Sequence, residues 1–170
     1  MSVMEVISKI CAFIPEVKRP EVEPPLKKRI MWSTIALLIF FIMGNIPLIG
    51  LAEESKTTLI QFQEVLASRM GTLLTAGIGP IVLASIMLQL LIGAKIIEID
   101  LADPRGRATF QSLQKLAAIL FCFFEGFAYP LSGWIRGDPI ILGLQIALGS
   151  IVLFYLDDLV GKHGIGSGIG

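Results

Sequence analysis

The sequence predicts an all-α membrane protein that crosses the bilayer several times. Three observations predict this class: 54% of the 170 residues are hydrophobic, the mean hydropathy is +0.78, and the charged residues gather in short clusters between long uncharged runs. A soluble core rarely needs so much apolar surface. Charged side chains at mid-membrane depth cost several kcal/mol, so lipid as the solvent explains the long uncharged runs.

Four runs are long enough to span about 30 Å of hydrocarbon, which takes roughly 20 helical residues. Trp and Tyr residues near the ends of these runs favour the headgroup level and anchor the boundaries. The predicted spans are residues 30–50, 70–94, 116–135 and 139–156, and the aromatic residues are Trp32, Tyr129, Trp134 and Tyr155.

The distribution of lysine and arginine predicts the orientation. Basic residues crowd the segments 1–29 and 95–115, the second of which includes the start of the third helix, whereas the segments 51–69 and 136–138 hold few. By the positive-inside bias the N-terminus is cytoplasmic, the two poorly basic segments are external, and residues 157–170 return to the cytoplasm.

The N-terminal segment 1–29 is expected to have two parts. Val3, Val6, Ile7, Ile10 and Ile14 recur at helical spacing, which favours a short helix lying in the cytoplasmic interface. The prolines that follow predict an extended connector to the first span.

The external segment SKTTLIQFQEVLASRMG predicts a half-helix. Thr58 and Gln61 fit a capping box, and the apolar stripe that follows is too short to cross a membrane. Two interpretations stay open: a surface helix packed on the external face, or a re-entrant piece that folds back into the protein, where non-helical backbone is tolerated only when shielded.

The second run, GTLLTAGIGPIVLASIMLQLLIG, shows an unusual face when drawn as a helix. At about 100° per residue, one narrow face is polar or small at both ends and aliphatic in the middle. A helix lining an hourglass pore would have this order, with the aliphatic residues at the constriction. The face consists of Gly71, Thr75, Ile78, Val82, Ser85 and Gln89.

Gly77, Gly79 and Pro80 predict a hinge in this helix, because glycine permits close approach and proline removes a backbone hydrogen bond. Glycine and proline are also common in membrane helices that have no hinge.

Glu125, in FCFFEGFAYP, lies inside the third run. A carboxylate at this depth is expected to face a partner or a water-filled path. The alternatives are a functional role and a purely structural hydrogen bond between helices.

After the PEV motif at Pro15 come, in order, the stretches RMGTLLTAGIGPIVLASIMLQLLIG, ADPRGRATFQSLQK and YLDDLVGKHGIGSGIG. These residues resemble the SecY family, the pore-forming alpha subunit of the Sec protein translocase, in its archaeal form. The resemblance implies the N-terminal half of a ten-helix inverted-repeat channel, with the first four spans and the start of the fifth.

The resemblance also implies roles for single residues. Ile78, Val82 and Ile169 match the hydrophobic pore ring. Leu83, Ser85, Gln89 and Glu125 match the lateral gate, although related archaeal proteins have a small hydroxyl residue where this sequence has Leu83. The half-helix matches the plug that seals the resting channel, with Thr57, Thr58, Leu59, Ile60, Phe62, Val65 and Leu66.

The implied function is a conduit for unfolded secretory proteins and for membrane-protein insertion, opened by signal sequences. The resemblance implies as partners the SecE (gamma) and Sec-beta subunits, the ribosome with its nascent chain, the lipid bilayer and the signal recognition particle receptor. It implies a multi-pass protein of the archaeal cytoplasmic (plasma) membrane, with no enzymatic activity, cofactor or metal.

Two rival classes of protein fit the sequence less well. A secondary transporter with broken helices needs a polar site at mid-depth, where the lining face here is aliphatic. An intramembrane hydrolase needs a nucleophile and a base, but Ser167 and His163 fall on a loop beside the membrane, where small residues suit a tight turn.

Overall fold

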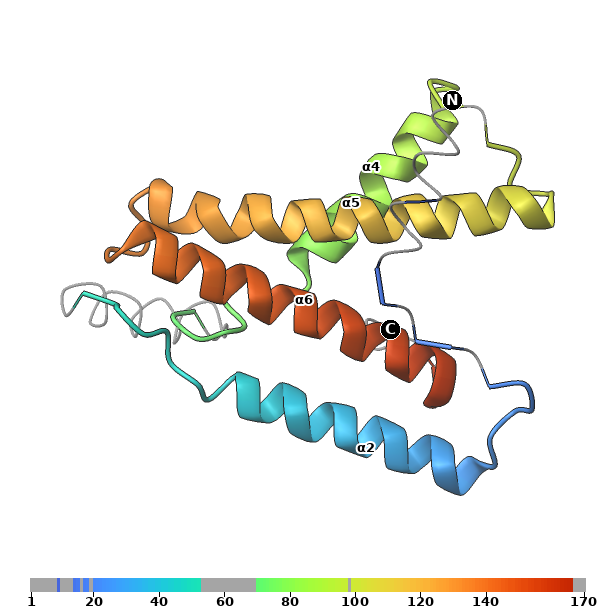
Figure 1. The fold of residues 1–170 in the computed structure, drawn as a ribbon, viewed down its shortest axis with the longest axis horizontal. Coiled ribbons are helices and arrows are strands. Elements are labelled where there is room, and N and C mark those ends of the chain that lie inside the picture. The colour runs from blue at the N-terminus through green and yellow to red at the C-terminus, as the bar shows by residue number, and fades with distance from the viewer. Residues whose placement is uncertain are drawn as a thin grey trace.

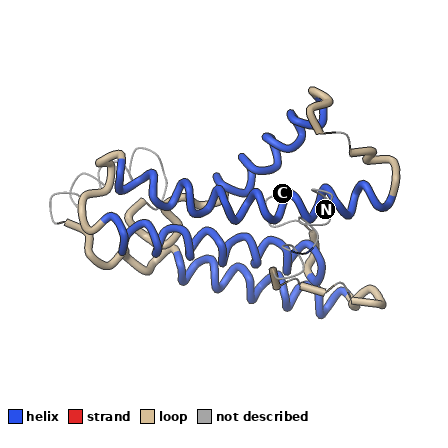
Figure 2. The backbone as a smooth tube through the Cα atoms, turned by 45° about the horizontal axis from the view of Figure 1, so that its top comes forward, coloured by secondary structure: helices blue, strands red, loops and turns tan. Residues whose placement is uncertain are grey.

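The computed structural model describes residues 20–52, 70–97 and 99–166, together with residues 9, 14–15 and 17–18. Among these residues α6 packs between α5 and α2, and α4 packs against α5. Figures 1 and 2 show α2, α6 and α5 side by side, with α4 running obliquely to them. The helices are α2 (Leu26–Met43), α4 (Gly79–Gly93), α5 (Pro104–Leu131) and α6 (Pro139–His163).

α2 starts and ends earlier than the predicted span 30–50. Its first turn follows Pro25, whose carbonyl accepts from the amides of Lys28 and Arg29. It ends at Met43 because Gly44 closes the last turn and Pro47 cannot continue a helix. Residues 44–52 are therefore a loop, which the hydropathy of the run did not reveal.

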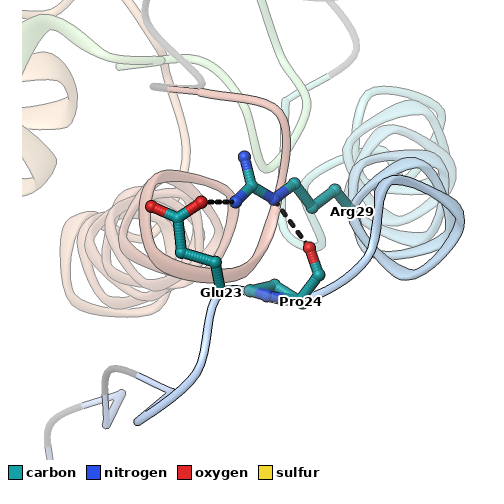
Figure 3. Close-up of polar contacts among 3 residues, drawn as sticks. All are labelled: Glu23, Pro24 and Arg29. Atoms are coloured by element: carbon teal, nitrogen blue, oxygen red, sulfur yellow. Dashed lines mark hydrogen bonds and ion pairs between the residues drawn. The ribbon is translucent and has the colours of Figure 1, made fainter.

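Arg29 ties the connector to the first turn of α2. Its Nε donates to the carbonyl oxygen of Pro24 at 3.0 Å, and its Nη2 lies 2.7 Å from Oε2 of Glu23 (Figure 3). Glu23 is almost fully exposed, so the ion pair contributes little stability and the bond to Pro24 matters more.

α4 begins at Gly79, so the prediction of a helix from residue 70 is wrong for its first part. Pro80 stands in the first turn, where its missing amide hydrogen costs nothing. Gly71 and Gly77 have positive φ values of 82° and 57°, which interrupt any helix before that point.

α5 begins well before the predicted start of the third span at residue 116. Asp103 precedes the helix and Pro104 occupies its first position, a common way for a helix to start. The first turns are polar, and hydropathy marks the part of a helix in lipid rather than the whole helix.

α6 likewise continues past the predicted end at residue 156. Asp138 caps its start by accepting from the amide of Ile140 at 3.2 Å. Near its end Lys162 pairs with Asp158 at 3.0 Å, one turn away, and Lys162 also donates to the carbonyl of Val17. The charged last turns extend the helix beyond its apolar part.

Described residues next to the segment 53–69 lie beside the predicted external segment 136–138. Backbone bridges join Pro47 to Thr72 and Leu51 to Gly137. A hydrophobic core underlies this end of the bundle, and it contains Leu48, Ala76, Ile135, Leu142 and Ile146. At the opposite end the ring of Trp32 contacts the ring of His163, which joins the start of α2 to the end of α6.

Among the described helices, α5 and α6 are long and apolar enough to span a bilayer. α4 has only 15 residues, shorter than the roughly 20 that a span takes. α2 has 18 residues, with Lys27, Lys28 and Arg29 in its first turn. α2 and α4, which overlap the other two predicted spans, therefore do not meet this criterion of length and apolar composition.

Small residues bring α5 and α6 into close contact. A Cβ added at Gly126 would lie 2.8 Å from the carbonyl oxygen of Gly143 and 2.9 Å from the Cβ of Ala147. Helices in membranes associate through such close packing, because lipid provides no hydrophobic force between them.

Gly126→Ala is expected to destabilise the purified full-length protein by about 1–3 kcal/mol, because the added methyl overlaps backbone atoms that cannot turn aside. Thermal unfolding in detergent measures the change. Gly161→Ala is the control, since a Cβ there meets nothing within 4 Å. Equal melting temperatures for both variants would contradict the role given to the contact.

Candidate functional site

The site is the start of α4 together with the segment that leads into it. Ile78 precedes the helix and is 43% exposed, and Val82 follows one turn later, partly buried. The residues of α4 that are buried are Pro80, Ile81, Ala84 and Leu88. Ile78 and Val82 therefore lie beside the buried face of α4 and are not part of it.

Residues 70–78 form a compact non-helical turn. Thr75 Oγ1 donates to the carbonyl of Thr72 and accepts from the amide of Gly71 at 3.1 Å, and the Thr75 side chain is buried. Gly71 and Thr75 are therefore not on a helical face with Ile78. The predicted pore-lining face is wrong in this part, because the wheel assumed a helix where the chain turns.

Gly77, Gly79 and Pro80 do not form a hinge inside a continuous helix, as the sequence predicted. Gly77 adopts a left-handed φ, Gly79 donates to the carbonyl of Ala76 at 3.2 Å, and Pro80 opens α4. The three residues start a helix. Proline in the first turn of a helix leaves the same sequence signal as proline at a bend, and Pro80 stands in the first turn of α4.

Glu125 of α5 reaches this helix start. A Cβ added at Gly79 would lie 3.1 Å from Oε2 of Glu125 and 3.5 Å from its Oε1. Gly79 thus leaves room for a carboxylate beside the first turn of α4, where the helix dipole favours negative charge. This pairing could not be predicted from the sequence, because the two residues lie on different helices.

The other predicted gate residues divide into two groups. Ser85 accepts from Gln114 Nε2 of α5 at 2.6 Å and donates to the carbonyl of Ile81, so it joins α4 to α5. Leu83 and Gln89 are exposed. The sequence did not predict a role for Gln114, because this residue lies in a polar stretch before the apolar run.

Several predicted site residues lie outside the described part of the chain. They are Ile169 of the pore ring and the plug residues Thr57, Thr58, Leu59, Ile60, Phe62, Val65 and Leu66. Ser167 lies outside it as well.

The described residues do fix both flanks of the segment 53–69. On one side Ala52 donates to the carbonyl of Arg136 at 2.9 Å. On the other, Leu48 donates to the carbonyl of Gly71 at 2.9 Å, and Leu73 donates to that of Ile46 at 3.2 Å. We call these paired stretches, residues 46–52, 71–73 and 136–137, the bridge region.

Apolar helices that enclose a non-helical backbone segment define a class of membrane channels and transporters. Comparison with known proteins narrows this class. A model of the plug domain of Sec61p matches residues 38–71, and the SecY model matches residues 72–170. The SecY translocase subunit of Pyrococcus furiosus is 41% identical, over 99% of this chain and 38% of that protein.

Two solved structures are similar in fold. One is a SecY structure whose plug domain is described as stabilising the closed state of the translocation channel and maintaining a membrane seal. Its TM-score is 0.81 at 40% identity, over 99% of this chain and 38% of that one. The other is Sec61 in the canine ribosome-channel complex, with a TM-score of 0.79 at 41% identity, over 99% of this chain and 39% of that one.

The chain belongs to the SecY family. The expected all-α membrane fold and the family resemblance are confirmed by these matches. The chain spans about 38% of the length of the curated archaeal relatives that it matches.

Proposed function

We propose that this chain is the N-terminal part of the central subunit of a protein-conducting channel. The observation that carries the proposal is the match to a plug domain and a SecY domain in unbroken succession over residues 38–170. The substrates would be unfolded secretory proteins and nascent membrane proteins, in keeping with the relatives named as translocase subunits.

In this proposal Ile78 and Val82 form part of the apolar constriction, with Ile169 as a third member. An empty apolar ring of this kind dewets and excludes ions, and its side chains move aside for an extended polypeptide without binding it strongly. Two observations support this role: Ile78 and Val82 lie beside the buried face of α4, and Ile78 is substantially exposed.

The gate of the proposed channel lies along α4 and α5. Ser85 and Gln114 hold the two helices together as one wall, and Glu125 lies where α4 begins. A signal sequence opens the gate if it binds the open state more tightly than the closed state. Its extended apolar segment would supply this difference in binding free energy.

The proposed partners are the SecE (gamma) and Sec-beta subunits, the ribosome and nascent chain, and the signal recognition particle receptor. The similarity to Sec61 in a ribosome-channel complex supports the ribosome. The proposed location is the cytoplasmic membrane with a cytoplasmic N-terminus, because basic residues crowd the end where α2 starts.

A secondary transporter remains the rival function. It would use a polar substrate site at the ends of broken helices. The start of α4 has an aliphatic pair instead, and the family matches do not favour a transporter.

Replacing both Ile78 and Val82 with Asn is expected to let water and ions leak through the resting channel, because the constriction is then wetted. Ion conductance of the complete channel complex in planar bilayers measures this. Met87 and Leu90 provide the control: both are exposed on α4, roughly 100–160° around the helix from the first pair at 100° per residue. Equal leak from both pairs would remove Ile78 and Val82 from the pore.

Deleting residues 57–66 is expected to leave a channel that still moves proteins but leaks small ions, because the apolar ring alone seals imperfectly. The same bilayer recording and a protein-export assay measure the two properties. A deletion variant as tight as the intact channel would show that this segment is not the plug.

Glu125→Leu is expected to change how apolar a signal sequence must be for export. Removing a polar group at the helix contact shifts the closed-open balance by about 1 kcal/mol, or roughly fivefold. Export of a graded series of signal sequences measures the threshold, with Glu125→Gln as the control that keeps size and hydrogen bonding. An unaltered threshold in Glu125→Leu leaves Glu125 a structural residue.

A further inference from the structure

Gln145 of α6 makes a pair of hydrogen bonds that neither the channel wall nor the pore requires. Its Oε1 accepts from the backbone amide of Ile49 at 3.0 Å, and its Nε2 donates to the backbone carbonyl of Ile49 at 2.9 Å. In a hydrogen-bonded pair of an antiparallel sheet, the amide and the carbonyl of one residue likewise both bond to the same partner. The side-chain amide therefore stands in for a peptide group.

The position of Ile49 explains why such a substitute is useful. Ile49 lies between Pro47 and Leu51, whose backbones form the two β-bridges of the bridge region. The Ile49 side chain is 75% exposed, so burial of apolar surface does little to hold this residue. Gln145 supplies the missing backbone pairing between the bridges.

The side chain of Gln145 is itself held in place. Its Nε2 also donates to the carbonyl of Ile141 at 3.3 Å, one turn earlier on α6. Glutamine is the side chain that suits the position, because a carboxylate cannot donate and a leucine or methionine can do neither.

α6 contacts the second flank as well. Gly149 lies one turn beyond Gln145, and a Cβ added there would collide with the backbone carbonyl of Leu73. The same side of α6 thus fixes residues 46–52 through Gln145 and residues 71–73 through Gly149. In sequence these stretches flank the segment 53–69, inside or beside the plug-domain match.

We propose that Gln145 is a positioning residue that holds the N-terminal flank of the segment 53–69, within the plug-domain match, in the arrangement of the sealed channel. The inference rests on the proposed function, because it assumes that the plug domain seals a channel. The hydrogen bonds of Gln145 go to Ile49 and Ile141, and Gln145 acts by fixing Ile49 to α6.

Gln145→Met tests the proposal in the full-length chain within the complete channel complex, because it keeps length and volume but removes both bonds. Resting ion conductance is expected to rise roughly tenfold, as the loss of two neutral hydrogen bonds predicts. Gln145→Glu keeps the acceptor alone and should leak less. Leu144→Ala, an exposed neighbour on the same helix, should not leak.

Combination with the plug deletion separates positioning from general damage to α6. In a channel lacking residues 57–66, Gln145→Met is expected to add no further leak, because nothing is left to position. The same added factor in both backgrounds would overturn the proposal. If the deletion variant leaks and Gln145→Met is as tight as the intact channel, the role of Gln145 is refuted and the proposed plug is supported. If the deletion variant is itself tight, the proposed plug function is refuted.

Hydrogen exchange provides a readout that does not depend on conductance. The amide of Ile49 is expected to lose protection in Gln145→Met and to keep most of it in Gln145→Glu, because the glutamate still accepts from this amide. The amide of Leu48, bonded to Gly71, serves as the internal reference. Unchanged protection at Ile49 in Gln145→Met would overturn the proposal.

Discussion

The structure depends on one constraint: in hydrocarbon, every backbone amide and carbonyl needs a partner within the protein. Residues 70–78 are not helical, and the backbone of Leu73 lies against α6 at Gly149, well inside that helix. Several of their polar groups are paired, by the Thr72–Thr75 turn and by the bonds of Leu48 and Leu73 across the bridge region. This pairing helps the chain to tolerate an irregular segment before α4.

Small residues make that shielding sterically available. Gly149 lets the backbone of Leu73 reach α6, and Gly126 lets α6 reach α5. In a soluble helix each glycine would cost up to about 1 kcal/mol relative to alanine. Here any larger side chain would separate the backbones, so the loss in helix propensity is offset by packing that lipid cannot provide.

Hydropathy predicted the two long helices well and the two shorter ones poorly. α5 and α6 both begin at the proline of an Asp-Pro pair. α5 starts before its predicted apolar run and α6 ends after its own, because hydropathy marks only the apolar part of a helix. The start of α4 failed because an apolar run does not distinguish a helix from a buried turn. Contacts between distant residues, such as Glu125 with Gly79 and Gln145 with Ile49, leave no periodic trace in a single sequence.

In the proposed gate, Leu83 lies one turn after Gly79 on the same face of α4 and is 43% exposed. The Glu125 carboxylate lies against Gly79. The position of Glu125 therefore depends on the space that a glycine leaves, and residue 83 lies on the face that this carboxylate approaches. In the proposed gate, α4 approaches α5 closely at Gly79, and the Ser85–Gln114 bond joins the same two helices.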